Sequence, residues 1–335
     1  MNRRLTATLA GASVLLLAAC SSTDAGQAGR AAGARVTVSS CGEQTSFPKP
    51  AQRLFVNDGN LISMVLALKA QDRVAAVSSI GRDKALLRKH YGAAVDSLKV
   101  VAPEYPSLET VVAQRPDVMV AGWGYGYSEE KGVTPEALRA KGIDAFTLTE
   151  SCRQHGSRAR GTVDPWTALR TDLTHLGTIT GHDADARRVN TDLDRRLAAL
   201  RSAPKPKKPP TVFVFDSGDK EVFSSGALGA PQAVIAAGGG RNPLSDLKDT
   251  WTSVSWERVA ASRPDAIFFV DYPPQSFAQK VHLLRTNPAT RDLPAVRQGR
   301  FLNLPYAMWT SGPLNIDAAE QARVALERWD LVPRR

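Results

Sequence analysis

Short apolar runs alternate along this chain with segments whose apolar residues recur every three or four positions. The runs at residues 54–56, 74–77 and 211–215 are typical of strands buried on both faces of a sheet. The periodic segments between such runs, for example residues 166–176 with Trp166, Leu169, Leu173 and Leu176 on one side, predict helices with one apolar face. This alternation predicts an α/β fold whose sheets are mostly parallel and flanked by helices.

One helix-and-strand unit occurs twice in the sequence. Residues 107–119 return as residues 255–267, with Ser, Glu, Val, Ala, Arg, Pro and Asp in the same register. In each copy the proline of an Arg-Pro-Asp turn ends a short helix, and an apolar strand follows. The repeat predicts two lobes built on the same plan, with chance similarity of two helix–strand joints as the alternative.

Helical segments are also expected between the two lobes. The second of them, at about residues 183–200, carries apolar residues at three-and-four spacing on one face and charges on the others. We interpret it as a long helix that joins the lobes, with a plain surface helix as the alternative. The predicted organisation is an N-terminal α/β lobe at residues 36–165, connecting helices at residues 166–202 and a C-terminal α/β lobe at residues 203–335.

The N-terminus has the features of an export signal. Arg3 and Arg4 precede an apolar run that ends in Leu-Ala-Ala-Cys, which resembles the lipobox of bacterial lipoproteins. We therefore predict that residues 1–19 are a signal peptide and that lipid on Cys20 anchors the protein to the outer face of the cell membrane. Residues 20–35, rich in Gly, Ala and Ser, would form a flexible tether. An ordinary signal peptide with an incidental cysteine is the alternative.

Export also decides what we expect of the two remaining cysteines. Cys41 and Cys152 would reach an oxidising compartment, where an even pair predicts a disulfide bond. The bridge would tie the first strand to the loop after the last strand of the first lobe. Two distant cysteines without paired histidines make a poor metal site, so we expect no metal held by the protein itself.

The composition is globular and does not favour nucleic-acid binding. The 335 residues are 43% hydrophobic and 23% charged, with a net charge of +10. The dense basic run at residues 205–208 is flanked by prolines and has no interleaved aromatic residues. It is therefore interpreted as a rigid connector rather than a nucleic-acid site.

The motifs of the common enzyme classes are missing from the sequence. The five histidines have no paired spacing that would suit zinc, and there is no Gly-x-Ser-x-Gly nucleophile elbow. The alternating glycines at residues 122–126 lack the lysine and helix start of a phosphate loop. We therefore expect no catalytic residues and no enzyme activity.

Binding is better supported than catalysis, because aromatic residues gather in loops that follow predicted strands. Aromatic walls with a few polar anchors suit a bulky small ligand, and strand ends are the usual place for it in open α/β sheets. The alternative is that each tryptophan fills the core or an edge. The candidate ligand-binding residues are Asn57, Asp58, Arg82, Trp123 and Tyr125 on the first lobe and Asp219, Trp251, Tyr272 and Trp309 on the second.

On these features the chain resembles the solute-binding proteins of ABC transporters for iron-siderophores and cobalamin. The resemblance covers about residues 36–331. It is carried by the two copies of the repeat, by the strand–loop–helix–strand unit at residues 53–77, by residues 293–301 and by the lipobox. It implies two α/β lobes joined by one long helix, with the ligand bound between the lobes.

The resemblance also implies roles for particular aromatic residues. Tyr125 in its Gly-Tyr-Gly sequence, together with Trp251 and Trp309, would contact the ligand as in similar hydroxamate-siderophore receptors. The arginine that such receptors carry just before the first copy of the repeat has no match here, because Pro103 stands near that place. Arg82 is the candidate to replace it.

Two acidic residues share one position in the two copies of the repeat. In similar proteins, residues at the places of Glu109 and Glu257 lie one on the outer face of each lobe and meet arginines of the transporter subunits. The resemblance therefore implies that they dock the receptor on its transporter. A general preference for negative charge near a helix start is the alternative.

Together these features predict a lipid-anchored receptor that captures an Fe(III)-siderophore and delivers it to an ABC permease and its ATPase. Iron would enter only as part of the chelated ligand, so no cofactor is expected, and the receptor would act as a monomer. A receptor for cobalamin, haem or another bulky cofactor is the alternative within this class. An extracytoplasmic enzyme or adhesion lipoprotein on the same fold is the alternative from a different class.

Overall fold

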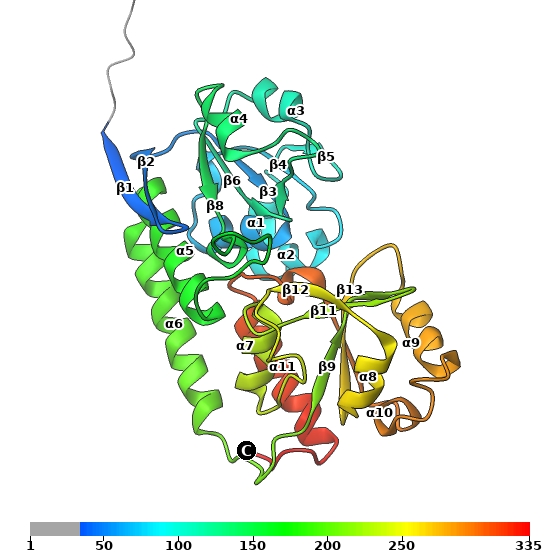
Figure 1. Cartoon of the computed structure of the whole chain (residues 1–335). Coiled ribbons are helices and arrows are strands. Elements are labelled where there is room, and N and C mark those ends of the chain that lie inside the picture. Colours follow the sequence, from blue (N-terminus) through cyan, green and yellow to red (C-terminus); the bar gives the residue numbers. More distant parts are fainter. Residues whose placement is uncertain (1–33) are drawn as a thin grey trace, which may run out of the picture. The chain divides into compact units, whose positions relative to one another are not determined.

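A parallel sheet forms the centre of the N-terminal lobe in the computed structural model, which describes residues 34–335 (Figure 1). Strands pair in the order β5-β4-β3-β6, with β8 also paired to β6, and all of these pairs are parallel. The strands are β3 (Leu54–Asn57), β4 (Val74–Ser78), β5 (Val100–Ala102), β6 (Val118–Trp123) and β8 (Asp144–Thr147). The helices of this lobe are α1 (Gly59–Ala67), α2 (Lys84–Tyr91), α3 (Leu108–Ala113) and α4 (Pro135–Arg139). The predicted signal segment, Cys20 and the tether up to residue 33 lie outside the described residues.

The C-terminal lobe has a parallel sheet of its own, in the order β14-β13-β9. A second sheet, β10-β11-β12, is antiparallel, and the sequence pattern does not predict it because its strands are short and rich in Ser and Gly. The strands are β9 (Val212–Phe215), β10 (Ser217–Gly218), β11 (Val222–Ser225), β12 (Trp251–Val254), β13 (Ala266–Asp271) and β14 (Phe301–Pro305). The helices are α7 (Ala230–Gly238), α8 (Trp256–Ser262), α9 (Phe277–Thr286), α10 (Pro294–Arg297) and α11 (Asn315–Arg328).

The two copies of the repeat form equivalent helix starts. Ser107 precedes α3 and its side chain accepts a hydrogen bond from the Thr110 N–H at 3.3 Å. Ser255 precedes α8 and accepts from the Arg258 N–H, also at 3.3 Å. A serine whose side chain accepts a hydrogen bond from the N–H three residues later satisfies one of the backbone N–H groups that lack a partner at a helix start. The same residue therefore sets the same local structure in both lobes.

The aspartates of the repeat join each copy to a neighbouring strand. Asp117 accepts hydrogen bonds from the backbone N–H groups of Gln52 at 2.6 Å and Arg53 at 3.0 Å, just before β3. Asp265 accepts from the Thr211 N–H at 2.7 Å, just before β9. Since β3 pairs with β6 and β9 pairs with β13, both aspartates stabilise the same junction of their sheets. The predicted α/β class and the two lobes of similar plan are confirmed.

Two long helices follow the N-terminal lobe. Helix α5 (Pro165–Thr180) starts at Asp164, whose side chain accepts from two backbone N–H groups, and it ends at Gly181 in the left-handed conformation. Helix α6 (Asp183–Ser202) has 20 residues, which corresponds to a length of about 30 Å. The expected helix at about residues 183–200 is thus present. Both helices run beside the two lobes in Figure 1, and they contact α1 of the first lobe and α7 of the second.

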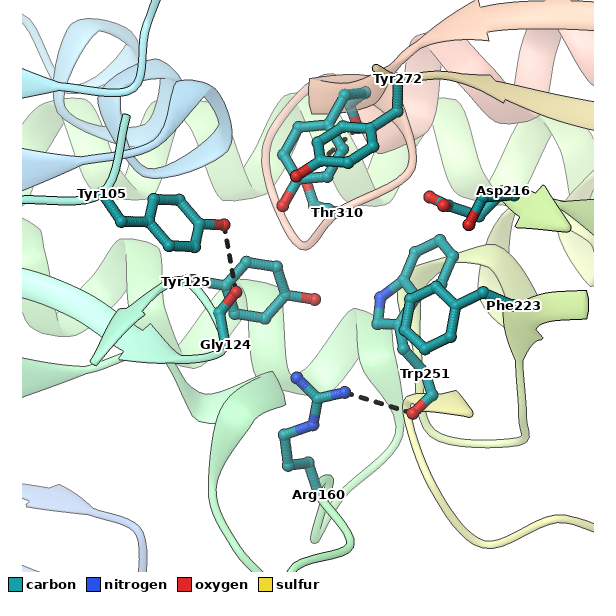
Figure 2. Close-up of a pocket in the computed structure, with 11 residues that line it drawn as sticks. Tyr105, Gly124, Tyr125, Arg160, Asp216, Phe223, Trp251, Tyr272 and Thr310 are labelled. Atoms are coloured by element: carbon teal, nitrogen blue, oxygen red, sulfur yellow. Dashed lines mark hydrogen bonds between the residues drawn. The ribbon is translucent and has the colours of Figure 1, made fainter. Parts of the chain in front are cut away.

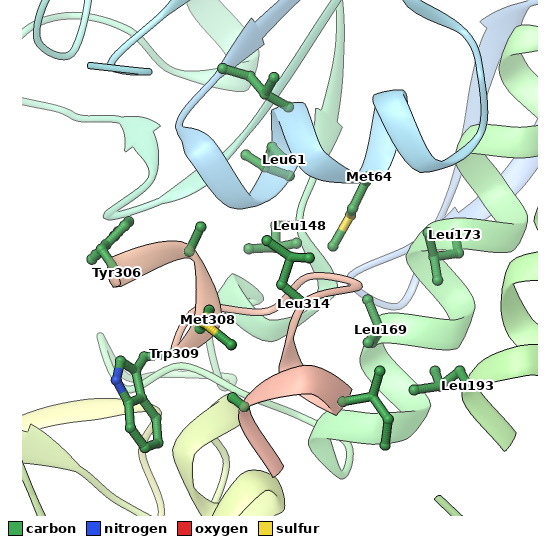
Figure 3. Close-up of a cluster of buried hydrophobic side chains, with 14 of the residues drawn as sticks. Leu61, Met64, Leu148, Leu169, Leu173, Leu193, Tyr306, Met308, Trp309 and Leu314 are labelled. Carbon is green, nitrogen blue, oxygen red and sulfur yellow. The ribbon is translucent and has the colours of Figure 1, made fainter. Parts of the chain in front are cut away.

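One hydrophobic core continues from the N-terminal lobe into the C-terminal lobe. Figure 3 shows Leu61 of α1 and Leu173 of α5 in the same cluster as Leu314, which precedes α11. Met308, at the end of the 3₁₀ helix η4 (Tyr306–Met308), is buried in this cluster as well. Full burial of one such side chain contributes about 1.5–3 kcal/mol, so the shared cluster holds the lobes together strongly.

The predicted disulfide joins Cys41 and Cys152. Cys41 lies in the turn between β1 (Arg35–Ser40) and β2 (Glu43–Pro48), an antiparallel hairpin. Cys152 directly follows the 3₁₀ helix η3 (Thr149–Ser151), after β8. The bridge therefore ties the N-terminal hairpin to the end of the first lobe, as the sequence predicts. Among residues 34–335 no helix combines the length and the apolar character that crossing a bilayer requires.

Candidate ligand-binding site

A cavity of about 250 Å³ lies between the lobes, where the carboxyl ends of their parallel strands face each other (Figure 2). Most of its wall is aromatic. Several of the residues that line it come one to three positions after a parallel strand, which is the usual place for ligand contacts in open α/β sheets. The lining residues are Tyr105, Gly124, Tyr125, Arg160, Asp216, Ser217, Phe223, Trp251, Tyr272, Tyr306 and Thr310.

The backbone conformation of the Gly-Tyr-Gly sequence directs the Tyr125 side chain into this cavity. Gly126 has a φ of +111°, and a Cβ at this position would lie 2.8 Å from the Asn57 side chain. The close approach lets the chain turn back after β6. The Tyr125 hydroxyl then donates to a carboxylate oxygen of Glu150 at 2.8 Å.

Glu150 connects the N-terminal lobe to the start of α7 in the other lobe. Its second carboxylate oxygen accepts from the Ala230 N–H, in the first turn of α7, at 2.9 Å. Burial of the side chain raises the pKa of Glu150 to about 7, although the two hydrogen bonds favour the ionised form. A single buried carboxyl therefore holds both Tyr125 and the second lobe.

Asp58 is the centre of a second polar network at the cavity. It begins α1 with a φ of +73°, and its side chain accepts from the Gly59 N–H at 3.1 Å. The hydroxyl groups of Tyr105 at 2.8 Å and Tyr306 at 3.1 Å also donate to it, the first from the N-terminal and the second from the C-terminal lobe. Burial raises the pKa of Asp58, against the effect of the nearby Arg82 and of these donors.

Arg82 places its guanidinium between this network and two tyrosines of the C-terminal lobe. A guanidinium nitrogen lies 3.9 Å from an Asp58 carboxylate oxygen. The guanidinium carbon lies 4.7 Å from the ring centre of Tyr272 and 4.9 Å from that of Tyr306. Such cation–π contacts stabilise by about 0.5–2 kcal/mol and hold both rings beside the cavity, where Figure 2 labels Tyr272.

Arg160 closes the opposite side of the cavity. Its guanidinium donates to the backbone oxygens of Trp123 at 3.1 Å and of Trp251 at 3.2 Å, one in each lobe. Asp249 lies 4.0 Å from the guanidinium and accepts from the Arg160 N–H at 3.0 Å. The loop that carries Arg160 is held at its base by a hydrogen bond from the Gly161 N–H to the Cys152 oxygen at 2.9 Å.

Three of the residues predicted to bind ligand line this cavity: Tyr125, Trp251 and Tyr272. Trp251 is the first residue of β12, which corrects its expected place in a loop. Asp58 and Arg82 lie next to the cavity and hold lining tyrosines in place. Five of the nine candidate residues therefore lie at or next to the cavity at the strand ends.

The other predicted ligand residues lie elsewhere. Asn57 is buried and accepts from the Ser78 hydroxyl at 2.8 Å, and Asp219 is exposed at the turn between β10 and β11. The ring of Trp123 lies under the guanidinium of Arg153 at 3.6 Å. Trp309 is 0% exposed in the hydrophobic core, where its indole N–H donates to the Phe269 oxygen at 3.0 Å. None of these four side chains is part of the cavity wall described above.

Other lining residues were not among the predicted set. Asp216 and Tyr306 directly follow β9 and β14, so the rule of strand ends could have found them. Tyr105 comes three residues after β5, a short strand that the sequence analysis did not predict. Arg160 and Phe223 depend on a long loop and on the unpredicted antiparallel sheet, so no local pattern indicates them.

Glu109 and Glu257 are both exposed, at the second position of α3 and of α8. Hydrogen bonds at the helix start lower the pKa of both carboxyl groups. For Glu109 the larger effect comes from its own backbone N–H and the smaller one from Ser107. For Glu257 the larger effect comes from Ser255 and the smaller one from its own backbone N–H. Both are thus negatively charged at neutral pH. Within the described part of the chain, no group of three His, Cys, Asp or Glu side chains is arranged to hold a metal ion.

Two α/β lobes that share a core and enclose an aromatic cavity at their strand ends define a solute-binding protein. The model of the periplasmic binding protein family matches residues 58–307, which is most of the chain. The protein belongs to this family, whose members bind solutes outside the cytoplasm and are not enzymes.

Comparison with individual proteins agrees with this assignment. A vitamin B12-binding protein of Salmonella typhi is 24% identical over 220 residues, covering 62% of this chain and 75% of that protein. The crystal structure of a periplasmic binding protein from Veillonella parvula has a TM-score of 0.73 at 24% identity, covering 88% and 97% of the two chains. A protein of an ABC-type Fe3+-hydroxamate transport system from Saccharomonospora viridis has a TM-score of 0.72 at 19% identity, covering 87% and 98%. These two structures have the same fold as this protein.

Proposed function

We propose that this protein captures an Fe(III)-siderophore between its lobes and delivers it to an ABC importer. The observation that carries the proposal is the cavity at the strand ends of both lobes, with an aromatic wall and hydroxyl groups. A siderophore saturates the coordination of its iron, so its receptor needs flat apolar contacts and hydrogen bonds rather than metal ligands. Tyr105, Tyr125 and Trp251 supply contacts of this kind.

The size of the cavity bears on the choice of ligand. Sites for drug-sized molecules have volumes of about 300–1,000 Å³, and this cavity of about 250 Å³ is smaller. A ligand of that size therefore requires the cavity to widen, and the required widening increases with the size of the ligand. Cobalamin, the largest candidate, remains the second proposal because of the similarity to the vitamin B12-binding protein of Salmonella typhi.

Fluorescence titration tests the proposal directly. Trp251 is 6% exposed and lines the cavity, so a ligand that enters should change its emission. We expect saturable quenching by ferric siderophores, and we expect Trp251→Phe to lose most of the change in emission. Trp329, which packs on Phe268 away from the cavity wall, offers a matched control as Trp329→Phe. A response to cobalamin or haem alone, with none to ferric chelates, would overturn the siderophore proposal.

The proposal includes the attachment and the partner of the receptor. Lipid on Cys20 would hold it at the outer face of the membrane, next to the permease and its ATPase. Glu109 and Glu257, exposed at equivalent positions of the two lobes, would each meet one half of the permease. Labelling of the intact protein with a radioactive fatty acid, lost in Cys20→Ser, tests the anchor.

A further inference from the structure

One carboxylate of the cavity wall forms no ion pair within 4.0 Å among the described residues. Asp216, directly after β9, is only 5% exposed and points into the cavity in Figure 2. The groups that favour its charged form are the hydroxyl of the adjacent Ser217 and, at longer range, the ammonium of Lys280. The Lys280 ammonium donates its hydrogen bonds not to Asp216 but to the backbone oxygens of Val270 at 2.6 Å and Tyr272 at 3.1 Å. A buried carboxylate with so few donors is costly unless another group completes its contacts.

The positive charges at the cavity already have anionic neighbours. Arg82 lies 3.9 Å from the Asp58 carboxylate, and Arg160 lies 4.0 Å from that of Asp249. Neither arginine forms an ion pair with Asp216 within 4.0 Å. The side of the cavity that Asp216 forms is therefore suited to a positive charge that comes from the ligand.

Aromatic rings surround the place where such a charge would lie. The backbone N–H of Asp216 donates to the Phe223 oxygen at 3.1 Å, which keeps these residues adjacent. The Phe223 and Trp251 rings are stacked, with centres 5.9 Å apart and planes 23° apart, and Figure 2 shows them beside the carboxylate. The electron-rich faces of aromatic rings attract cations, and a nearby carboxylate adds a charge-assisted hydrogen bond.

We propose that Asp216, with Phe223 and Trp251, forms a subsite for a positively charged group of the ligand, such as a primary ammonium. This inference rests on the proposed function and narrows it to Fe(III) chelates that carry a cationic tail. Asp216 would then determine the specificity for charged ligands, while the remaining aromatic residues of the cavity wall accommodate the body of the chelate.

Two chelates that differ only in this charge test the inference. One is a linear trihydroxamate Fe(III) chelate with a terminal ammonium, and the other is the same chelate with that nitrogen acetylated. We expect the wild-type protein to bind the charged chelate about 10- to 100-fold more tightly, as the loss of a hydrogen bond to a charged group predicts. Asp216→Asn should remove this preference and leave the affinity for the acetylated chelate nearly unchanged.

Control variants separate the subsite from general effects on charge or folding. Glu221→Gln removes an exposed negative charge from the same hairpin and should keep the preference. Asp216→Glu retains the charge and should keep part of it. The comparison of the two chelates on the wild-type protein remains decisive even if Asp216→Asn fails to fold.

The outcomes also separate this inference from the proposed function. Equal affinity of the wild-type protein for both chelates would overturn the inference and leave the siderophore proposal standing. An equal loss of affinity for both chelates in Asp216→Asn would show that Asp216 is structural, and would also overturn it. If neither chelate binds and cobalamin or haem does, both the proposed function and the inference are wrong.

Discussion

Three buried carboxyl groups of the N-terminal lobe accept hydrogen bonds from the C-terminal lobe. Asp58 accepts from the Tyr306 hydroxyl, Asp83 from the Ala307 N–H at 3.0 Å, and Glu150 from the Ala230 N–H. Burial raises the pKa of both Asp83 and Glu150 to about 7. At the scale of single residues, the contact between the lobes therefore depends on carboxyl groups that change charge near neutral pH.

The stability of the protein should therefore fall as the pH rises towards neutrality. The ordinary pKa of a Glu carboxyl is 4.5, and that of Glu150 in the fold is about 7. Its neutral form is favoured by folding, so this contribution is complete below pH 4.5 and is lost as the pH rises through 7. We expect Glu150→Gln to raise the free energy of unfolding at pH 8 by up to about 3 kcal/mol and to change it little at pH 4.5.

The amide can keep both hydrogen bonds, because its NH₂ can donate to the Tyr125 hydroxyl and its oxygen can accept from the Ala230 N–H. Urea unfolding at the two pH values measures the effect, with the exposed Glu130→Gln as the control. An unchanged pH dependence in Glu150→Gln would contradict the prediction.

Two tryptophans predicted to bind ligand should behave differently when they are replaced. Trp251→Ala removes part of the cavity wall, so ligand affinity should fall by about 1–3 kcal/mol with the fold intact. Trp309→Ala removes a core residue that is 0% exposed and should cost about 3–5 kcal/mol of folding stability. Titration calorimetry and thermal unfolding of both variants separate the two effects. Full affinity in Trp251→Ala would show that ligand binds elsewhere.

At the scale of helices and strands, the disulfide adds a covalent link to a hairpin that already packs Phe47 against Phe146 of the first lobe. The hairpin β1-β2 carries Cys41 and pairs with no other strand among the described residues. The bridge closes a long loop, since Cys41 and Cys152 are 111 residues apart in sequence. Replacing both cysteines by serine should cost about 2–4 kcal/mol of unfolding free energy. Urea unfolding of the soluble domain measures this cost, and wild-type stability in the double variant would refute the expected role.

The elements that the sequence predicted are those with local signals. Helices α5 and α6 are marked by Asp164 at the start of the first, Gly181 between them and a regular apolar face. The antiparallel sheet β10-β11-β12 escaped prediction because its strands have two to four residues and depend on pairing across the lobe. For the same reason the chemistry of Trp251 indicated a candidate for ligand contact, but no local pattern indicated its place in a strand.

The site was predictable only in part, because a cavity is made by contacts between distant segments. Strand ends can be found in a sequence, and they indicate residues such as Tyr125 and Tyr272. Arg160 reaches the cavity because its loop is held at Cys152 and Asp249, a contact that no pattern of neighbouring residues records. Trp309 shows the opposite error, since an aromatic residue after a strand can also turn into the core.

At the scale of the whole molecule, the repeat gives each lobe one exposed glutamate at the same position. A receptor with two similar lobes that docks on a permease of two similar halves needs one matched contact for each half. Charges at the rim of an interface mainly set the rate and orientation of encounter. Since Glu109 and Glu257 do not line the cavity, docking and ligand binding should be separable.

We therefore expect Glu109→Ala and Glu257→Ala to reduce uptake of the ligand, most strongly together, while ligand affinity stays nearly unchanged. Uptake by cells and affinity of the purified proteins should be measured on the same variants. Glu130→Ala, which removes another exposed charge of the first lobe, is the matched control. Normal uptake in the double variant, or a parallel loss of affinity, would show that docking lies elsewhere.

The core that runs from one lobe to the other has a consequence for how the chain folds. Leu173 of α5 and Leu193 of α6 pack in the same cluster as Leu61 and Leu314, one from each lobe (Figure 3). Separating the lobes would expose this cluster to water, so neither half of the chain can keep its stability alone. Unfolding should then be a single cooperative transition of both lobes. A ligand that binds between them would accordingly protect the entire molecule against heat and proteases, including helices far from the cavity.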